Sequence, residues 1–195
     1  MAPTPSKSSR EEAQRLLVEA HAHLRDGAFE RAIELFTACL AHAPARAEAY
    51  RDRAIARLRL KQSAEALADF TEARRLDPAD REAWLGVAMS LAMDSRVYDA
   101  LTEFEALLSV HPTFARGHLQ LGLLYFQLCV TAKGRQQMEQ ALACQPTGAE
   151  RRLIETALKE QTQLDAKRYY RPDFEALHNR RGSEQAMAHT ARSEA

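Results

Sequence analysis

One set of residues recurs at a fixed distance along this chain, and this regularity restricts its possible folds more than any other feature. Small, large apolar and proline positions each return every 34 residues over four copies, without insertion or deletion. The small positions form two slots, one with Ala20, Ala54, Ala88 and Gly122, the other with Ala32, Ala66, Ala100 and Gly134. A period of roughly 20 to 50 residues is typical of arrays in which each unit stacks on its neighbours.

Each copy is predicted to contain two antiparallel helices joined by a short turn. The small slots fit places where helix axes cross about 8–10 Å apart, because that separation leaves no room for a longer side chain. Large apolar side chains should fill the space between successive pairs, and they are Phe36, Phe70, Phe104 and Met138. Prolines should end each second helix, because proline disfavours helix in the preceding residue; they are Pro44, Pro78, Pro112 and Pro146.

The pattern resembles the tetratricopeptide repeat family over about residues 13–146. The third copy is the most similar, with Trp84, Ala88, Ala100, Phe104 and Pro112. His118 stands where an aromatic residue or leucine is usual, and Gly134 stands where alanine is usual. Glu19 and Arg53 occupy a slot that holds Val87 and Leu121 in later copies. The resemblance implies an all-α fold, a right-handed α-solenoid of antiparallel helix pairs.

The predicted organisation has three parts: a disordered N-terminus at 1–8, a repeat domain at 9–169 and a basic, mostly flexible tail at 170–195. The repeat domain comprises copies at 13–46, 47–80, 81–114 and 115–148, and a capping helix at 148–169 that covers the last apolar face. Helices are expected at about 9–25, 30–43, 47–60, 64–77, 81–93, 97–110, 115–128, 132–144 and 148–169. Capping boxes are expected at 9–12 and 147–150, and side-chain caps at Ser63 and Asp80.

Composition excludes several classes of function. The 27 basic and 27 acidic residues cancel, which argues against a general nucleic-acid or membrane-surface role for the whole chain. No stretch approaches the roughly 20 apolar residues of a membrane span, and residues 1–9 do not form a secretory signal. Cys39, Cys129 and Cys144 are expected to be buried, reduced thiols, which fits a cytoplasmic location.

The resemblance implies that the first helix of each copy lines a concave groove, and helical spacing selects the side chains that point there. The predicted partner-binding groove comprises Leu17, His21, Leu24, Arg51, Ile55, Leu58, Leu85, Met89, Met93, Leu119, Leu123 and Phe126. Its apolar members would form a nearly continuous floor, which is typical of a surface that binds an amphipathic helix or an extended segment. Alternatively, the chain's own ends fill the groove, or tight winding places these residues in the core.

Two other sets of residues are candidates for binding a partner. Family members that grip the acidic C-termini of Hsp70 and Hsp90 use Lys and Asn on these helices, whereas the matching positions here hold Leu17, His21, Asp52, Glu82 and Gly86, so that activity is not expected. The tail motif of Arg168, Tyr169, Tyr170, Arg171 and Phe174 could bind nucleic acid or dock onto a protein. The favoured interpretation of these basic residues is a solvated helix end, where cations are stabilised near the C-terminal pole of the capping helix.

Catalytic signatures are missing from the sequence. It contains no Gly-rich phosphate loop, HExxH or GxSxG, and no two histidines stand at i, i+4. We therefore expect no enzyme activity, cofactor, metal or small-molecule substrate. The predicted function is a protein-interaction adaptor or scaffold. The alternatives are a dedicated client chaperone, similar in architecture to the tetratricopeptide chaperones of type III secretion translocators, and a nucleic-acid-associated factor acting through the tail.

Overall fold

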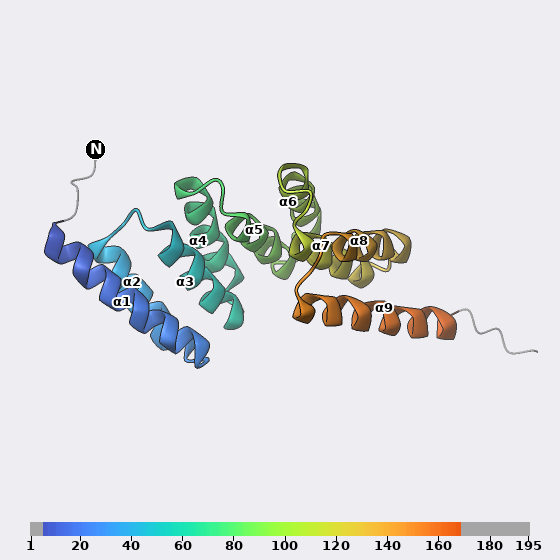
Figure 1. Cartoon of the computed structure of the whole chain (residues 1–195), viewed down its shortest axis with the longest axis horizontal. Helices are drawn as coiled ribbons and strands as arrows, with labels where there is room; N and C mark the ends of the chain where they lie inside the picture. The colour runs from blue at the N-terminus through green and yellow to red at the C-terminus, as the bar shows by residue number, and fades with distance from the viewer. Residues whose placement is uncertain (1–5, 169–195) are drawn as a thin grey trace, which may run out of the picture. The chain divides into compact units, whose positions relative to one another are not determined.

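The computed structural model describes residues 6–168, and this part of the chain is entirely helical (Figure 1). Its helices are α1 (Lys7–Arg25), α2 (Phe29–His42), α3 (Ala47–Arg59), α4 (Ser63–Leu76), α5 (Arg81–Met93), α6 (Val97–Val110), α7 (Ala115–Gln127), α8 (Thr131–Ala143) and α9 (Gly148–Arg168). The chain divides into two compact units, Met1–Glu155 and Thr156–Ala195. The all-helical fold predicted from the repeat is confirmed, and the predicted ends of the helices agree within two residues.

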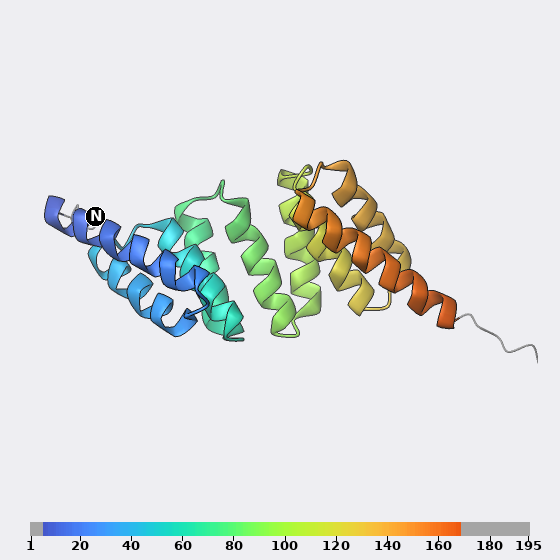
Figure 2. The same ribbon diagram turned by 60° about the horizontal axis from the view of Figure 1, so that its bottom comes forward.

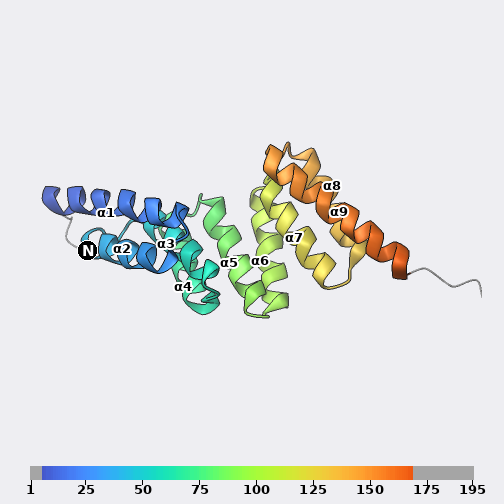
Figure 3. The same cartoon turned by 90° about the horizontal axis from the view of Figure 1, so that it is seen from below.

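The first unit is a stack of antiparallel helix pairs. The pairs are α1–α2, α3–α4, α5–α6 and α7–α8, and the two helices of each pair pack against each other. Figures 1 and 2 show this for α1 and α2, which lie side by side. Seen from below, the pairs follow one another in chain order (Figure 3). Contacts between α1 and α3, α3 and α5, and α5 and α7 show that the first helices form one continuous row. This row positions the predicted groove.

The two small slots and the large apolar slot lie in the core, as predicted. The alanines of both small slots are fully buried, Gly122 and Gly134 are buried too, and the four large side chains are at most 2% exposed. The reason for glycine at 134 is visible, because a Cβ there would overlap the ring of Phe126. Gly134 thus makes room for an aromatic side chain that the other copies lack.

His118 is buried and reproduces a hydrogen bond made by tryptophan one copy earlier. Trp84 Nε1 donates to the Pro78 carbonyl at 3.0 Å. His118 Nε2 lies 2.9 Å from the Pro112 carbonyl, the equivalent acceptor, and its Nδ1 lies 2.8 Å from the Gln137 side chain. A ring nitrogen that carries a proton can therefore replace the indole N–H, and the departure from the family pattern leaves the fold unchanged.

The turn within each pair uses a left-handed residue that also recurs every 34 positions. Gly27, Lys61, Ser95 and Cys129 have φ between 59° and 77°. The N–H of the following residue bonds to the carbonyl five residues earlier, as in Gln62 to Arg57 and Arg96 to Leu91. This Schellman-type ending satisfies carbonyls at the helix C-terminus. Only the first of these turns has glycine, the residue that adopts this conformation without strain, at the left-handed position.

Helix caps agree with the predictions in two places and differ in two. Asp80 caps α5, and Thr147 and Glu150 form the predicted capping box of α9. The cap of α1 is Ser6 rather than Ser9, because the Ser9 hydroxyl donates instead to the His42 carbonyl at 3.0 Å. Ser63 is also not a cap. It is the first residue of α4, and Gln62 precedes it without a side-chain bond.

The prediction of three buried thiols is wrong for Cys129, which is exposed at the α7–α8 turn. Cys144 is half-buried, and Cys39 is fully buried with its Sγ against the Ala13 carbonyl. Burial raises the pKa of the Cys39 thiol, which keeps it protonated and unreactive at neutral pH. Position 129 faces solvent because it is the left-handed turn residue.

Helix α9 begins in the first unit, where Ile154 is fully buried and Leu153 is exposed. In the second unit, Gln161 donates to Asp165 one turn later. The capping role of this helix stays a prediction, as do the domain limits. Apart from the backbone of Arg168, the tail motif lies outside the described residues. Among the described helices, none combines the length and apolar character needed to cross a bilayer.

Candidate functional site

A mainly apolar pocket lies in the predicted groove, formed by the first helices of the third and fourth copies with one residue of α6. Its volume is about 310 Å³. The lining residues are Met89, Ala92, Met93, Phe104, Gln120, Leu123, Leu124 and Gln127. We call this the α5–α7 pocket. Three of the predicted groove residues, Met89, Met93 and Leu123, lie in it.

The open apolar surface of the pocket is concentrated on flexible side chains. Met93 is 47% exposed, while Met89 and Leu123 are half-buried. A pocket of this volume can take one or two large apolar side chains of a partner. Thioethers suit this role because their three rotatable bonds adjust to differently shaped guests.

Three predicted groove residues do not face an open surface. Leu17, Leu85 and Leu119 are 3%, 1% and 2% exposed, so their assignment to an exposed floor is wrong. Their shared slot is enclosed where successive first helices contact one another. For these three positions the alternative stated above is correct: the helices pack so closely that the side chains are part of the core. Leu24, Ile55 and Leu58 are half-buried and pack against the core clusters outside the pocket.

The same enclosed slot holds Arg51 in the second copy, and a network of carboxylates compensates its charge. Arg51 donates to Asp52 at 2.9 Å and to Asp80 at 2.9 Å. Burial by itself would lower the pKa of the guanidinium, but the hydrogen bonds and negative charges of Asp52 and Asp80 outweigh it and raise the pKa. Arg51 is therefore committed to an internal network rather than open to a partner.

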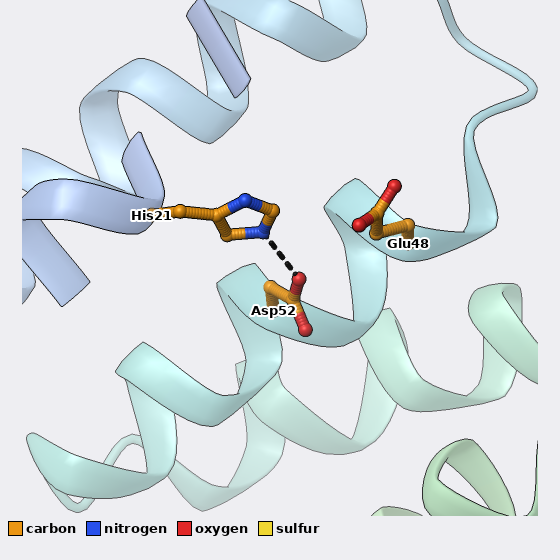
Figure 4. A group of neighbouring side chains, drawn as sticks. All are labelled: His21, Glu48 and Asp52. Carbon is orange, nitrogen blue, oxygen red and sulfur yellow. Dashed lines mark hydrogen bonds and ion pairs between the residues drawn. The ribbon is translucent and has the colours of Figure 1, made fainter. Parts of the chain in front are cut away.

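His21 joins the same network through its contact with Asp52, which Figure 4 shows. Its Nε2 lies 2.7 Å from Asp52 Oδ2, and Glu48 stands one turn before Asp52 on α3. Each of the three side chains offers one ligand atom, and these atoms all lie within 4.8 Å of one another. Such a group could in principle bind a metal ion. However, Arg51 already places a positive charge on the Asp52 carboxylate. We interpret the group as an ion-pair network that joins α1, α3 and α5.

At the positions that match the Hsp70- and Hsp90-binding residues of other family members, several side chains already contact other residues of this chain. Asp52 is held by His21 and Arg51, and Glu82 accepts from Arg116 at 2.9 Å. At Gly86, any side chain would overlap the Phe70 ring. Phe126, the last predicted groove residue, is half-buried with its ring over Gly134.

Sequence reasoning missed part of the pocket and both ion-pair groups. Phe104 and Leu124 line the pocket from beneath although they belong to the core, and Gln120 lies one position beyond the predicted groove slot. The partner of Arg53 was also missed: it is Asp69, which is bound at 2.8 and 2.7 Å. The sequence does contain a signal for this pair. In the second copy, Arg53 stands in a slot that is apolar in later copies, and Asp69 stands where the first copy has Leu35, so the two unusual residues indicate an ion pair.

The fold and this row of first helices define an α-solenoid repeat protein. A tetratricopeptide repeat model matches residues 17–80 and 51–108. Similar solved structures include a tetratricopeptide protein of Thermus thermophilus, 23% identical, with a TM-score of 0.69 over 78% of this chain and 84% of that one. Another is YrrB, described as having an unusual peptide-binding site, 22% identical, with a TM-score of 0.62 over 78% of this chain and 76% of that one. Residues 17–108 therefore belong to the tetratricopeptide repeat family.

One curated relative is similar over a short segment. This is a protein SGT1 homolog of Oryza sativa subsp. japonica, 43% identical over 67 residues. The match covers 34% of this chain and 18% of the relative, so the chain spans less than a fifth of that protein's length. A third solved structure, the first tetratricopeptide domain of Spaghetti (RPAP3) bound to an HSP90 peptide, is 21% identical, with a TM-score of 0.57 over 62% of this chain and 95% of that domain.

Proposed function

We propose that this chain is a protein-interaction adaptor that binds an apolar or amphipathic segment of another protein in the α5–α7 pocket, without catalysis. The observation that carries the proposal is the pocket itself, in which exposed Met93 stands beside half-buried Met89 and Leu123. Fully burying one leucine-sized side chain of a partner contributes about 1.5–3 kcal/mol, before the costs of association. Peptide binding by the structural relatives YrrB and Spaghetti supports the same role.

The test selects ligands from a phage-displayed random peptide library and measures their affinity by fluorescence anisotropy. Met93→Glu places a charge at the pocket rim, where the wild-type side chain is 47% exposed, so the fold should be retained. We expect it to weaken binding at least tenfold, because a carboxylate replaces apolar contact area. Tyr98→Glu is the matched control, since Tyr98 is 87% exposed on α6 outside the pocket. Equal affinities of wild type and Met93→Glu would contradict the proposal.

The client-chaperone alternative makes a different prediction for the isolated chain. An adaptor should be a stable monomer, whereas a dedicated chaperone should be unstable or dimeric until its client binds. Size-exclusion chromatography with light scattering, together with thermal unfolding, separates the two. A stable monomer supports the adaptor.

A further inference from the structure

Two exposed cations share a slot of the repeat with two of the residues that line the α5–α7 pocket. Met93 and Gln127, which line the pocket, occupy one slot of the 34-residue repeat, and the same slot holds Arg25 at the end of α1 and Arg59 at the end of α3. Both arginines are exposed. Among the ion pairs of the described residues, none includes either of them.

Most other charges on these helices are paired or distant, but the exposed carboxylate of Asp26 directly follows Arg25. Arg51 is bound by two carboxylates, and Arg116 is paired with Glu82. Glu48 is exposed, but it stands eleven positions before Arg59 on α3, about 16 Å away at 1.5 Å per residue. The C-terminal ends of α1 and α3 therefore present Arg25 and Arg59 to solvent outside the ion pairs of the described residues, with Arg59 the one that has no carboxylate next to it in sequence.

We infer that the partner segment is acidic on one side of its apolar anchor, with carboxylates at the third and sixth positions from it. The inference rests on the proposed function, because the anchor must occupy the α5–α7 pocket. Packed helices lie about 8–10 Å apart, and an extended chain advances about 3.3 Å per residue, so one repeat corresponds to roughly three residues. With the anchor at Met93, the nearer carboxylate meets Arg59 and the farther one meets Arg25.

The probes are synthetic, fluorescently labelled peptides with one leucine anchor and glutamates at three and six positions from it. One version places the glutamates before the anchor and one places them after it, and each has counterparts in which one or both glutamates are glutamine. In the favoured orientation, changing both glutamates should weaken binding by roughly fivefold or more, since two exposed ion pairs are lost. Arg25→Ala with Arg59→Ala should weaken the glutamate peptide equally and leave the glutamine peptide unchanged.

Double-mutant cycles test the register itself. Arg59→Ala should couple to the glutamate at the third position, and Arg25→Ala to that at the sixth. Coupling in the opposite order would overturn the inference. Arg31→Ala is the control, because Arg31 is an exposed cation on α2 that pairs locally with Glu34. Circular dichroism melting should show only small changes, since the variants remove exposed charges at helix ends.

The two levels of the proposal fail differently. If glutamate and glutamine peptides bind equally, and both lose affinity with Met93→Glu, the acidic register is wrong and the adaptor proposal stands. If no peptide binds in a Met93-dependent manner, both the register and the α5–α7 pocket as its anchor site are wrong.

Discussion

The second and third copies build the same helix pair with different forces. In the third copy, Leu85 and Val87 of α5 fill their slots by apolar packing, and both are at most 2% exposed. In the second copy the equivalent positions hold Arg51 and Arg53, each compensated by carboxylates. The backbone is the same, so the repeat fixes the geometry of a slot and leaves its chemistry open. The second copy contains the buried ion pairs, whereas the third copy, together with the fourth, forms the α5–α7 pocket.

The largest expected effect comes from Asp69→Ala, which removes the acid of the buried group in the second copy. Asp69 is 5% exposed at its side chain and binds both Arg53 and Arg57. Its loss leaves two partly buried guanidinium groups without their carboxylate, so we expect the free energy of unfolding to fall by about 3–5 kcal/mol. Denaturation in urea, followed by circular dichroism, measures the change.

Two further variants sharpen this comparison. Glu34→Ala breaks an exposed pair with Arg31, and it should change stability by about 0.5 kcal/mol or less. Arg53→Val and Arg57→Leu combined with Asp69→Leu give the second copy the residues found at Val87, Leu91 and Leu35, and this triple variant should restore most of the stability. A loss below about 1 kcal/mol for Asp69→Ala would show that the buried group contributes little to folding.

An intermediate effect is expected from Gly134→Ala in the fourth copy. Alanine normally stabilises a helix interior relative to glycine by up to about 1 kcal/mol, but here the new Cβ overlaps the Phe126 ring. We expect a net destabilisation of about 1–3 kcal/mol, measured by urea denaturation. Phe126→Leu should make the same alanine substitution tolerable. If Gly134→Ala is stabilising in the wild-type background, the ring does not require glycine.

The smallest effect concerns the turns, where the second and third copies are alike. Lys61 and Ser95 both have φ of 61°, a conformation that favours glycine. Lys61→Gly or Ser95→Gly should each raise the free energy of unfolding by about 0.5–1 kcal/mol. In the opposite direction, Gly27→Ala should lower it, although a Cβ there meets no atom within 4 Å. Unchanged thermal melting of all three variants would refute the backbone explanation.

The sequence predicted helices and core better than it predicted the surface. The repeat located the buried slots because side-chain size is itself constrained there, as at Ala88 and Phe104. It placed Leu17, Leu85 and Leu119 in an open groove because i, i+3 spacing identifies a face of one helix but not how closely the next helix approaches. The His21–Asp52 contact joins residues 31 positions apart, and only the packing of α1 against α3 brings them together.

The most direct test of the α5–α7 pocket uses NMR of the chain with ¹³C-labelled methionine methyl groups and a selected peptide. Met89 and Met93 line the pocket, whereas Met138 is fully buried in the core. The proposal predicts that saturating peptide shifts the methyl signals of Met89 and Met93 and leaves that of Met138 in place. Saturated binding that leaves both pocket signals unmoved would contradict it.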